Sequence, residues 1–390
     1  MLSLSLAVSL ACLATALASP LNETLNAPRK IGKRCTGIIE SLADVAAAEE
    51  CLTINIAGFT VPAGSTFALA PPDGAVVSMT GQITFAVKNW AGPLMTVTGN
   101  SITFNGNNHN LVGNGDQYWD GLGINGGVQK PDPMLRINMG GTFENVQLVN
   151  SPGRAVAIGG SSLTVSGVTV NNAAGAAANS RSAGKPAGAN TDGFDVSANN
   201  VRIQNSVGES QNFRKPARRF VADEPISSDD CLAINRGTNI VFTGNSCTGG
   251  HGISVGSIAS GVVVSGVTIS NNVVTNNVNG LRIKTDATAT GSTVSNVVYS
   301  GNKLSGITGF GVLIDQSYPS TLGTPGTGVV ISGVSFTGTN TIAVTSTAHR
   351  VEVNCGSTSS CTGTWNFAGL TATGGTGSTI KNAPVTGGSF

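Results

Sequence analysis

The sequence predicts an all-β fold, a parallel β-helix (solenoid) in which short strands stack along one axis. Of the 390 residues, 53 are glycine, 11% are charged and 5% are aromatic. This composition disfavours helices, in which glycine and β-branched residues cost most. A strand-and-turn unit recurs from about residue 95, and Val146 and Val168 lie 22 residues apart in successive units. That period is too short for a propeller blade and suits one coil of a solenoid.

The recurring unit is a run of alternating β-branched residues, a turn with glycine or asparagine, and a second strand. It occurs at 143–151, 163–172, 239–247, 262–272, 294–302 and 329–339. Stacked units turn valine and isoleucine inward, and asparagines at bends, as in 270–272 and 276–277, can bond to neighbouring backbone groups. A β-sandwich is the alternative, because strand alternation alone does not separate the two folds. The repeated Ser-Gly-Val units favour the solenoid.

The N-terminal segment indicates export. Residues 1–18 hold an apolar run that ends in Ala16-Leu17-Ala18, which is typical of a signal peptide and shorter than the ~20 residues of a membrane helix. Residues 19–34 are expected to be a pro-segment ending at the dibasic pair Lys33-Arg34, with a solvated charge cluster as the alternative. Residues 35–390 then form one secreted, extracellular domain.

Six cysteines remain after the signal peptide, an even number that argues for disulfides in an exported protein. Their proximity in sequence predicts the pairs Cys35–Cys51, Cys231–Cys247 and Cys355–Cys361. No Cys-x-x-Cys pair or histidine-rich cluster indicates zinc. Without residues 1–34 the chain has 17 basic and 19 acidic side chains, because four of the 21 basic and one of the 20 acidic residues are removed. That balance argues against nucleic-acid or membrane partners.

Two segments depart from the strand pattern. Residues 37–52 have apolar residues at helical spacing and predict a short helix that caps the open N-terminal end of the stack. Residues 208–226, in contrast, form an anomalous insertion that is rich in charge and lacks alternation. It is either a loop beside a cleft or an intron retained in the coding sequence. A long loop is tolerable because the entropic cost of loop closure grows only slowly with length. If it is translated, we expect weaker activity through lost registration of the acidic residues around it.

Four short motifs bring charged residues to successive coils: NTDGFDV (190–196), SSDDCLAIN (227–235), GGHGISVGS (249–257) and GLRIK (280–284). Separately each is a modest signal, since Asp-Gly is a common turn and adjacent aspartates usually lie in solvated loops. Their order, one motif per coil, indicates a site with several carboxylates and several cations.

These motifs resemble those of the polygalacturonases, glycoside hydrolase family 28, which carry Asn-Thr-Asp, Asp-Asp, Gly-His-Gly and Arg-Ile-Lys in that order. The segment 113–131, with its Trp-Asp-Gly and Asn-Gly-Gly, resembles the fungal endo-acting members, and GFGVLIDQSY (309–318) resembles a strand ending in a substrate-contacting tyrosine. The resemblance spans roughly residues 35–355. It implies a right-handed single-stranded parallel β-helix that hydrolyses α-1,4-linked galacturonan in pectin by an endo-acting, inverting reaction. No cofactor and no metal are expected.

The resemblance also implies residue roles. Glycoside hydrolysis needs an acid to protonate the leaving oxygen and a base to activate water. Asp229 would be the acid, Asp192 and Asp230 would hold and deprotonate the water, and His251 would support the acid. Crowding should raise the pKa of at least one carboxyl.

The remaining roles concern the substrate. Arg282 and Lys284 lie two apart, on one face of a strand, and would bind a galacturonate carboxylate, while Asn190 would hydrogen-bond and Tyr318 would stack on sugar. The expected partners are pectin or polygalacturonate and an inhibitor protein of plant origin, and the chain is expected to be a monomer.

The sequence departs from the family's motifs at two places, and several other functions remain as alternatives to this interpretation. Ser227-Ser228 replaces the family's Asn-Gln, and Ser317 stands where the family tends to have aspartate. The acidic residues could instead bind calcium, although the neighbouring cations disfavour it. The rival functions are pectate lyase-like elimination, an exo-polygalacturonase or rhamnogalacturonase, and a wall-binding solenoid without activity.

Overall fold

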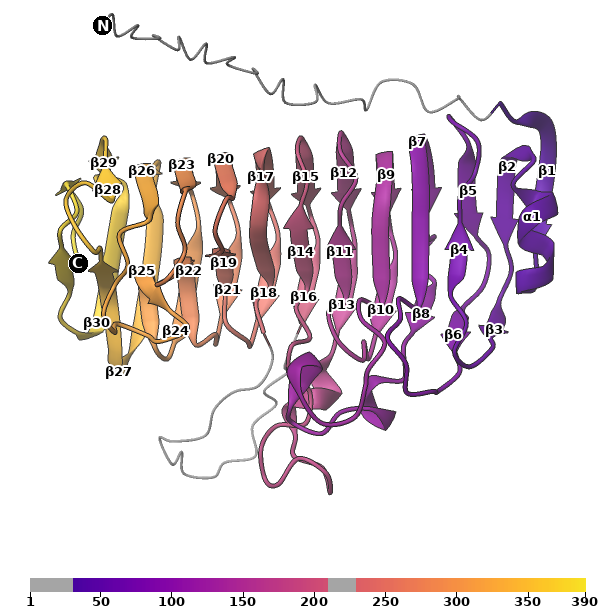
Figure 1. Ribbon diagram of the computed structural model, residues 1–390, viewed down its shortest axis with the longest axis horizontal. Coiled ribbons are helices and arrows are strands. Elements are labelled where there is room, and N and C mark those ends of the chain that lie inside the picture. Colours follow the sequence, from indigo (N-terminus) through magenta and orange to yellow (C-terminus); the bar gives the residue numbers. More distant parts are fainter. Residues whose placement is uncertain (1–30, 210–228) are drawn as a thin grey trace, which may run out of the picture.

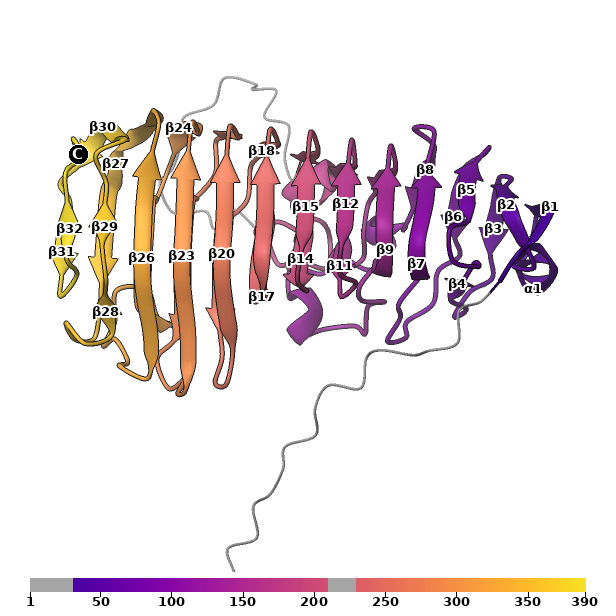
Figure 2. The same cartoon turned by 90° about the horizontal axis from the view of Figure 1, so that it is seen from above.

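A computed structural model describes residues 31–209 and 229–390, and these form a parallel β-helix. Every pairing between its named strands is parallel, as in the pairs β10–β13 and β20–β23. The predicted fold class is therefore confirmed. The predicted signal peptide, residues 19–30 and most of the predicted insertion lie outside the described residues. Figures 1 and 2 show the coils following one another along the long axis, with the C-terminus at one end.

The strands form three faces, and a strand on each face pairs with its counterpart in the next coil. The first face consists of β4 (Phe67–Leu69), β7 (Met95–Asn105), β9 (Leu135–Glu144), β11 (Val156–Ile158), β14 (Phe194–Ser197), β17 (Leu232–Thr243), β19 (Ile253–Ile258), β22 (Asn279–Asp286), β25 (Phe310–Tyr318), β27 (Asn340–Asn354) and β31 (Thr379–Lys381).

The second face consists of β1 (Lys33–Ile39), β2 (Cys51–Ile56), β5 (Val76–Met79), parts of β7, β9 and β17, β12 (Leu163–Ser166), β15 (Val201–Gln204), β20 (Val263–Ser270), β23 (Ser292–Ser300), β26 (Val329–Thr337), β28 (Cys361–Thr362), β29 (Trp365–Asn366) and β32 (Val385–Thr386). In Figure 2 the strands β20, β23 and β26 lie side by side.

The third face consists of β3 (Phe59–Val61), β6 (Ile83–Phe85), β8 (Asn110–Val112), β10 (Gln147–Val149), β13 (Thr169–Asn171), β16 (Val207–Glu209), β18 (Ser246–Thr248), β21 (Val273–Thr275), β24 (Lys303–Ile307), part of β27 and β30 (Leu370–Thr376). Long strands such as β7 and β27 turn a corner and contribute to two faces.

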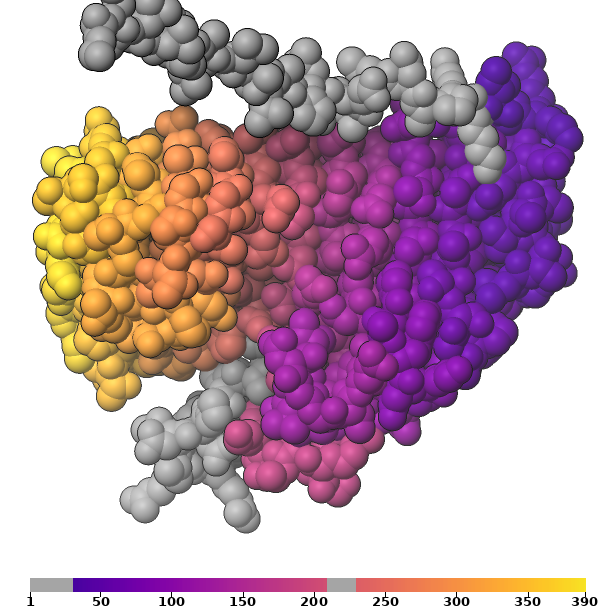
Figure 3. Space-filling model, in the orientation of Figure 1, coloured from indigo at the N-terminus to yellow at the C-terminus, as the bar shows by residue number. Residues whose placement is uncertain are grey.

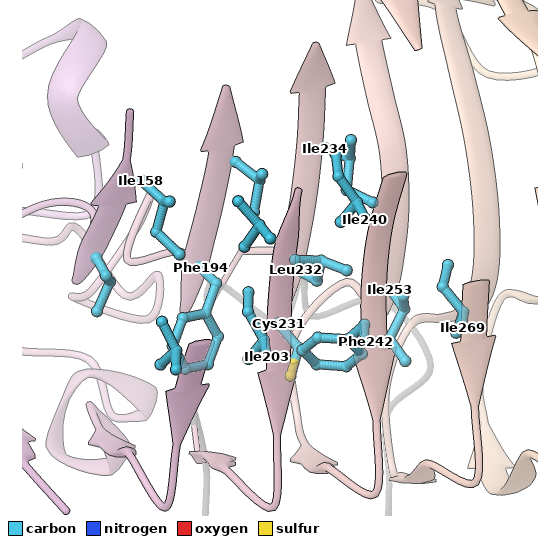
Figure 4. Packing of buried hydrophobic residues seen from close by; sticks show 14 of the residues in the cluster. Ile158, Phe194, Ile203, Cys231, Leu232, Ile234, Ile240, Phe242, Ile253 and Ile269 are labelled. Atoms are coloured by element: carbon cyan, nitrogen blue, oxygen red, sulfur yellow. The ribbon is translucent and has the colours of Figure 1, made fainter. Parts of the chain in front are cut away.

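The core fills the space between the three faces. Inward residues alternate with exposed ones, as in β23, so each coil adds a layer of apolar side chains. Around the middle of the stack Phe194 and Phe242 meet edge to face with ring centroids 6.5 Å apart, beside Ile203 and Leu232 (Figure 4). Burial of these rows fixes the register, because a slip by one residue would turn every inward side chain outward.

A row of buried asparagines connects the second and third faces at successive bends. Asn245, Asn272, Asn302 and Asn340 are all at most 2% exposed. The side-chain oxygen of each later residue accepts the backbone N–H of the one before it, at 2.9–3.1 Å. The residue before Asn272, Asn271, has φ 55°, a left-handed conformation that asparagine tolerates. The predicted role of bend asparagines is confirmed.

The spacing of the coils differs from the 22 residues that the sequence suggested. Leu148 pairs with Val170 at that distance, but Thr169 pairs with Val207 and Val207 with Ser246, 38 and 39 residues on. In the first of these steps, residues 172–190 leave the stack as a loop, and in both the parallel pairing continues on the far side. The stack also begins earlier than predicted, since β1 to β6 already form coils.

The predicted helix over 37–52 is mostly wrong. Its ends belong to the strands β1 and β2, which pair in parallel, and the helical part shrinks to η1 (Leu42–Asp44) and α1 (Val45–Ala48). The cause is burial of the two strands that overlap this segment: Ile39 of β1 and Ile54 of β2 enter the core, and a helix over 37–52 would disrupt both strands. The short α1 still lies at the N-terminal end of the stack (Figure 1).

All three predicted disulfides are present: Cys35–Cys51, Cys231–Cys247 and Cys355–Cys361. The first ties β1 to β2, and the second lies directly behind the acidic motif of 227–235. Among the described residues, no helix has the length and apolar character that crossing a bilayer requires.

Candidate active site

The four charged motifs meet where strands of the first face begin. Asp192 precedes β14, Asp229 and Asp230 precede β17, and His251 precedes β19. Backbone hydrogen bonds join these bends: Gly193 N–H to Asp230 O at 2.9 Å and His251 N–H to Asp229 O at 3.2 Å. Asp192 and Asp230 therefore lie on neighbouring coils although the chain between them is long. The described residues on either side of the predicted insertion keep their pairing, since β14 and β15 both pair with β17, so the expected loss of registration is not seen, while the expected weaker activity stays a prediction.

Asp229 is held by two side chains. Nδ1 of His251 lies 2.9 Å from Oδ1 of Asp229, and Nδ2 of Asn190 donates to Oδ2 at 2.8 Å. Asn190 has φ 50° and its own side-chain oxygen accepts the backbone N–H of Ile124 at 3.2 Å. The amide thus connects the segment that contains Ile124 to the carboxylate.

Asp230 has a different set of partners and is 1% exposed. Nζ of Lys284 lies 2.7 Å from Oδ2, and the hydroxyl of Ser254 donates to Oδ1 at 2.7 Å. An ammonium and a hydroxyl together satisfy a carboxylate that would be costly to bury alone. Asp230 is therefore held in place by one cation and one hydroxyl group.

Two cations and an aromatic ring continue the site toward the C-terminal coils. Arg282 and Lys284 come from β22, and Tyr318 ends the next strand, β25. The Arg282 Cζ lies 5.9 Å and the Lys284 Nζ 5.4 Å from the centre of the Tyr318 ring. Nε of Arg282 is shielded from solvent and has no hydrogen-bond partner within 31–209 and 229–390. This part of the site can take an anionic group. Ser317, in contrast, is buried and its hydroxyl donates to Asp315 Oδ1 at 2.7 Å, so it supports the turn.

The protonation of the acids follows from their surroundings. Burial raises the pKa of the Asp192 carboxyl well above its usual range, and the charges of Asp229, Asp195 and Asp230 raise it further. Burial acts on Asp229 in the same direction, but the hydrogen bond and charge of His251, the charge of Lys284 and the Asn190 amide lower its pKa below the ordinary value. The expectation that crowding raises at least one carboxyl pKa is confirmed, at Asp192.

His251 shows the matching effect. Burial alone would lower its pKa, but the hydrogen bond and charge of Asp229 raise it above the ordinary value. In the free site the proton of the Asp229–His251 pair therefore rests on the imidazole. Both shifts favour the ionised forms of the pair in the free site, and the role of Asp229 as the general acid stays a prediction.

A second ionic cluster, which the sequence interpretation missed, lies beside Asp192. Asp195, in β14, accepts a hydrogen bond from Asn235 Nδ2 at 2.9 Å, and Nε of Arg154 lies 3.6 Å from its Oδ2. Because Oδ2 has no hydrogen-bond partner within the described ranges, this last contact is electrostatic only. Arg154 also forms an ion pair with Asp132. Asp195 stands in the motif of 190–196, so the motif itself was the available signal.

Two loops leave the stack beside these bends and form a wall. One runs over 113–132 with η2 (Gly115–Gln117) and η3 (Gly123–Asn125), and the other runs over 172–190 with η4 (Ala173–Ala176). They touch through Gly121 N–H and Ala187 O, at 2.9 Å. Figures 1 and 3 show both projecting from the same edge of the helix.

The first loop is organised around a buried ion pair. Nζ of Lys130 lies 2.9 Å from Oδ1 of Asp120, with side chains 1% and 8% exposed. The ammonium also donates to the carbonyl oxygens of Gly123, Gly126 and Val128. Lys130 therefore fixes the backbone around Ile124, and through it the position of Asn190.

Asp229, Asp230 and His251 could in principle bind a metal, because each offers an atom within 4.8 Å of the others. Their atoms, however, already pair with one another and with Lys284. The Lys284 ammonium on Asp230 puts a positive charge where a calcium ion would need free carboxylate oxygens. The residues present do not fit a cation site.

Three comparisons place this arrangement among known proteins. The sequence profile of the family described as "Glycosyl hydrolases family 28" matches residues 51–212 and 221–389. The match omits residues 213–220, which lie inside the predicted insertion. The chain is 39% identical to the endo-polygalacturonase of Sclerotinia sclerotiorum over 84% of its own length and 80% of that protein.

It is also 37% identical to a probable endopolygalacturonase A of Neosartorya fischeri over 97% of each chain. Among solved structures, it is similar to endopolygalacturonase I of Stereum purpureum in complex with two galacturonates. That similarity has a TM-score of 0.82 and 46% identity, and covers 91% of this chain and all of the other.

Proposed function

Because the chain belongs to glycosyl hydrolase family 28, we propose that it hydrolyses α-1,4-galacturonan, the backbone of pectin, at internal linkages. Relatives that align over most of the chain are named endopolygalacturonases, and the similar solved structure holds galacturonate. The observation that carries the proposal is the contact of carboxylates and cations in one place. Asp229 and Asp230 lie beside His251 and Lys284, with Arg282 next to them.

The cations account for the choice of substrate. A galacturonate unit carries a carboxylate, and a guanidinium with a shielded, unpaired Nε can bind it by charge-assisted hydrogen bonds. Lys284 adds positive charge from the same strand, and Tyr318 presents a ring beside both. A neutral galactose unit would leave Arg282 without its partner. We assign carboxylate binding to Arg282, with Lys284 and Tyr318 beside it.

The acids account for the reaction. A water held by Asp192 and Asp230 attacks the anomeric carbon, and one of these carboxylates accepts the proton of the water. Asp229 protonates the glycosidic oxygen as the bond from the anomeric carbon to that oxygen breaks. One product gains a reducing end and the other a 4-hydroxyl group. Attack by water opposite to the leaving group inverts the anomeric configuration.

The proton that Asp229 delivers comes from the pair it forms with His251. In the free site the imidazole holds it, 2.9 Å from Oδ1. An anionic substrate unit that binds next to Asp229 disfavours a second negative charge there and moves the proton toward the carboxyl. His251 thus supports the acid without contacting the reacting atoms.

The location and partners of the enzyme are part of the proposal. A pectin-degrading enzyme acts outside the cell, and three disulfides suit that environment. We propose a secreted monomer whose active-site face an inhibitor protein of plant origin can also recognise. Gel filtration of the purified chain alone tests the monomeric state, and gel filtration with a pectin-free plant protein extract tests recognition by an inhibitor protein.

The main experiment assays purified protein on unesterified polygalacturonate. We expect new reducing ends, a rapid fall in polymer length and inverted product anomers by NMR. A lyase would instead give an unsaturated product that absorbs in the ultraviolet and would lose activity in chelator. Asp229→Asn should lower kcat by 10²-fold to 10⁴-fold, and Asp116→Asn, an exposed loop aspartate, is the control. Unchanged turnover by Asp229→Asn would refute the assignment of Asp229 as the general acid.

A further inference from the structure

One exposed arginine lies on the same row of the first face as the active site. In β9, Arg136 points outward between the buried residues Leu135 and Ile137. The register connects Arg136 to Ala157 in β11, and Ala157 to Asp195 in β14. Figure 1 shows these strands as neighbours along the helix.

The row continues through the site to the cation of the C-terminal side. Asp195 pairs with Ala233, Ala233 with Ser254, and Ser254 with Arg282. Five strand intervals therefore separate the two arginines. At about 4.8 Å between neighbouring strands, Arg136 and Arg282 lie roughly 24 Å apart, on opposite sides of the acids.

The surroundings of Arg136 leave its guanidinium available. Its side chain forms no ion pair or hydrogen bond with any residue of 31–209 and 229–390. Its two neighbours in the row are Thr96 and Ala157, whose short side chains cannot cover it. An arginine that is merely exposed to solvent has no reason to lie in one row with Arg282 and the acids. A cation that binds a polymer, in contrast, must lie along the path of that polymer.

We propose that Arg136 is a second carboxylate-binding residue, which holds a galacturonate unit of the substrate several units away from the bond that is cleaved. The proposal rests on the proposed function, since it takes the same polyanionic chain to lie along the row. Arg282 then binds a carboxylate on one side of the acids and Arg136 binds one on the other. A short oligomer can reach only one of them, and a long oligomer reaches both.

Steady-state kinetics on oligomers of two lengths test this. Arg136→Gln should raise KM about fivefold on hexagalacturonate and on the polymer, with kcat unchanged, which corresponds to the loss of one exposed charge contact. Trigalacturonate should be cleaved as by the wild type. Arg136→Lys should recover most of the loss, because it keeps the charge. The matched control is Arg202→Gln, an exposed outward arginine of β15 on the second face.

Equal kinetics of Arg136→Gln and wild type on hexagalacturonate would overturn the inference, and so would an equal loss on both oligomers. Thermal unfolding of each variant shows whether folding has changed. Calorimetric binding of hexagalacturonate to Asp229→Asn, with and without Arg136→Gln, separates the two proposals. If the wild type cleaves no polygalacturonate, the proposed function fails, and weaker binding of the double variant would still support the role of Arg136. Equal binding of both would refute that role.

Discussion

Nδ1 of His251 and Oδ1 of Asp229 lie 2.9 Å apart. This contact lowers the pKa of Asp229 and raises that of His251, so each residue favours the charged form of the other. A raised histidine pKa means that the ion pair is fully present below about pH 6.5 and is lost as pH rises through the folded-state value. A lowered aspartate pKa means that the pair is lost on the acidic side only as pH falls through the folded-state value of Asp229.

Activity should accordingly decline on the alkaline side as His251 loses its proton. His251→Gln removes that stored proton, so we expect kcat to fall about 10²-fold and the alkaline limb of kcat/KM to disappear. The pH–rate profile of both proteins on polygalacturonate measures this. A variant that kept the wild-type alkaline limb would show that another group titrates there.

Asp195 predicts a second pH effect, on stability. Burial raises its pKa to about 6, although the charge of Arg154 and the Asn235 hydrogen bond act in the opposite direction. A carboxyl that stays protonated in the folded state but ionises in the unfolded chain makes folding less favourable as pH rises from about 4 to about 6. Asp195→Asn should remove up to about 3 kcal/mol of this dependence. Urea unfolding between pH 4 and 7 measures how the free energy of unfolding changes with pH in each protein. An equal pH dependence in the wild type and Asp195→Asn would contradict the prediction.

The buried asparagine row makes a prediction about folding. Asn272 donates to Phe242 O and Asn302 Oδ1 and accepts the backbone N–H of Asn245. Asn272→Ala leaves these buried groups without partners and should lower the free energy of unfolding by about 2–4 kcal/mol. Asn271→Gly, one residue earlier and at φ 55°, should stay within about 0.5 kcal/mol of the wild type. Similar losses in both would mean that the turn, and not the buried amide, matters.

The Lys130–Asp120 pair should control activity more than overall stability. Lys130→Met leaves the Asp120 carboxylate without its cation, and because the pair lies in a loop outside the stack, the loop can open locally while the stack stays folded. Because Lys130 fixes the loop that positions Asn190, we expect kcat to fall about tenfold or more with little change in Tm. The exposed Lys303→Met is the control. Recovery of activity in Lys130→Met with Asp120→Leu would indicate that loop shape suffices.

The disulfide behind the acidic pair should stabilise more than the C-terminal one. Cys231–Cys247 closes a separation of 16 residues and Cys355–Cys361 one of 6. Chain entropy then predicts losses of about 3 and about 2 kcal/mol when each pair is replaced by serine. Only the first should also lower kcat, since Cys231 follows Asp230 directly. Denaturant unfolding and turnover of the two double variants provide the comparison.

Local patterns predicted much of the stack but not its ends. Alternation and Gly or Asn turns located strands such as β20 and β23, because each obeys the same inward–outward rule. The coils before residue 95 were missed, since their strands lack the Ser-Gly-Val unit. The segment 37–52 has helical spacing, yet pairing of β1 with β2 and burial of Ile39 outweigh that weak local preference.

For the site, sequence identified the groups and the fold supplied their relations. Motif order together with the resemblance to the family singled out Asp192, Asp229, His251 and Lys284, whose individual roles stay predictions. Motif order could not show that the pKa of Asp229 is lowered and that of His251 raised, because these shifts depend on burial and on the contacts of Asp229 with His251 and the Asn190 amide. Nor could it reveal that Arg136 shares a row with Arg282, since the register spans loops of irregular length.

The separate coils also bear on how such an enzyme changes over generations. The row from Arg136 to Arg282 takes one residue from each of six strands, and each strand interval is comparable in length to a sugar unit. With the polymer bound along this row as proposed, a substitution of an outward residue such as Arg136 alters the contact with about one unit and leaves the contact at Arg282 intact. Preferences for charge or esterification along the polymer can drift position by position, without rebuilding the acids at the centre.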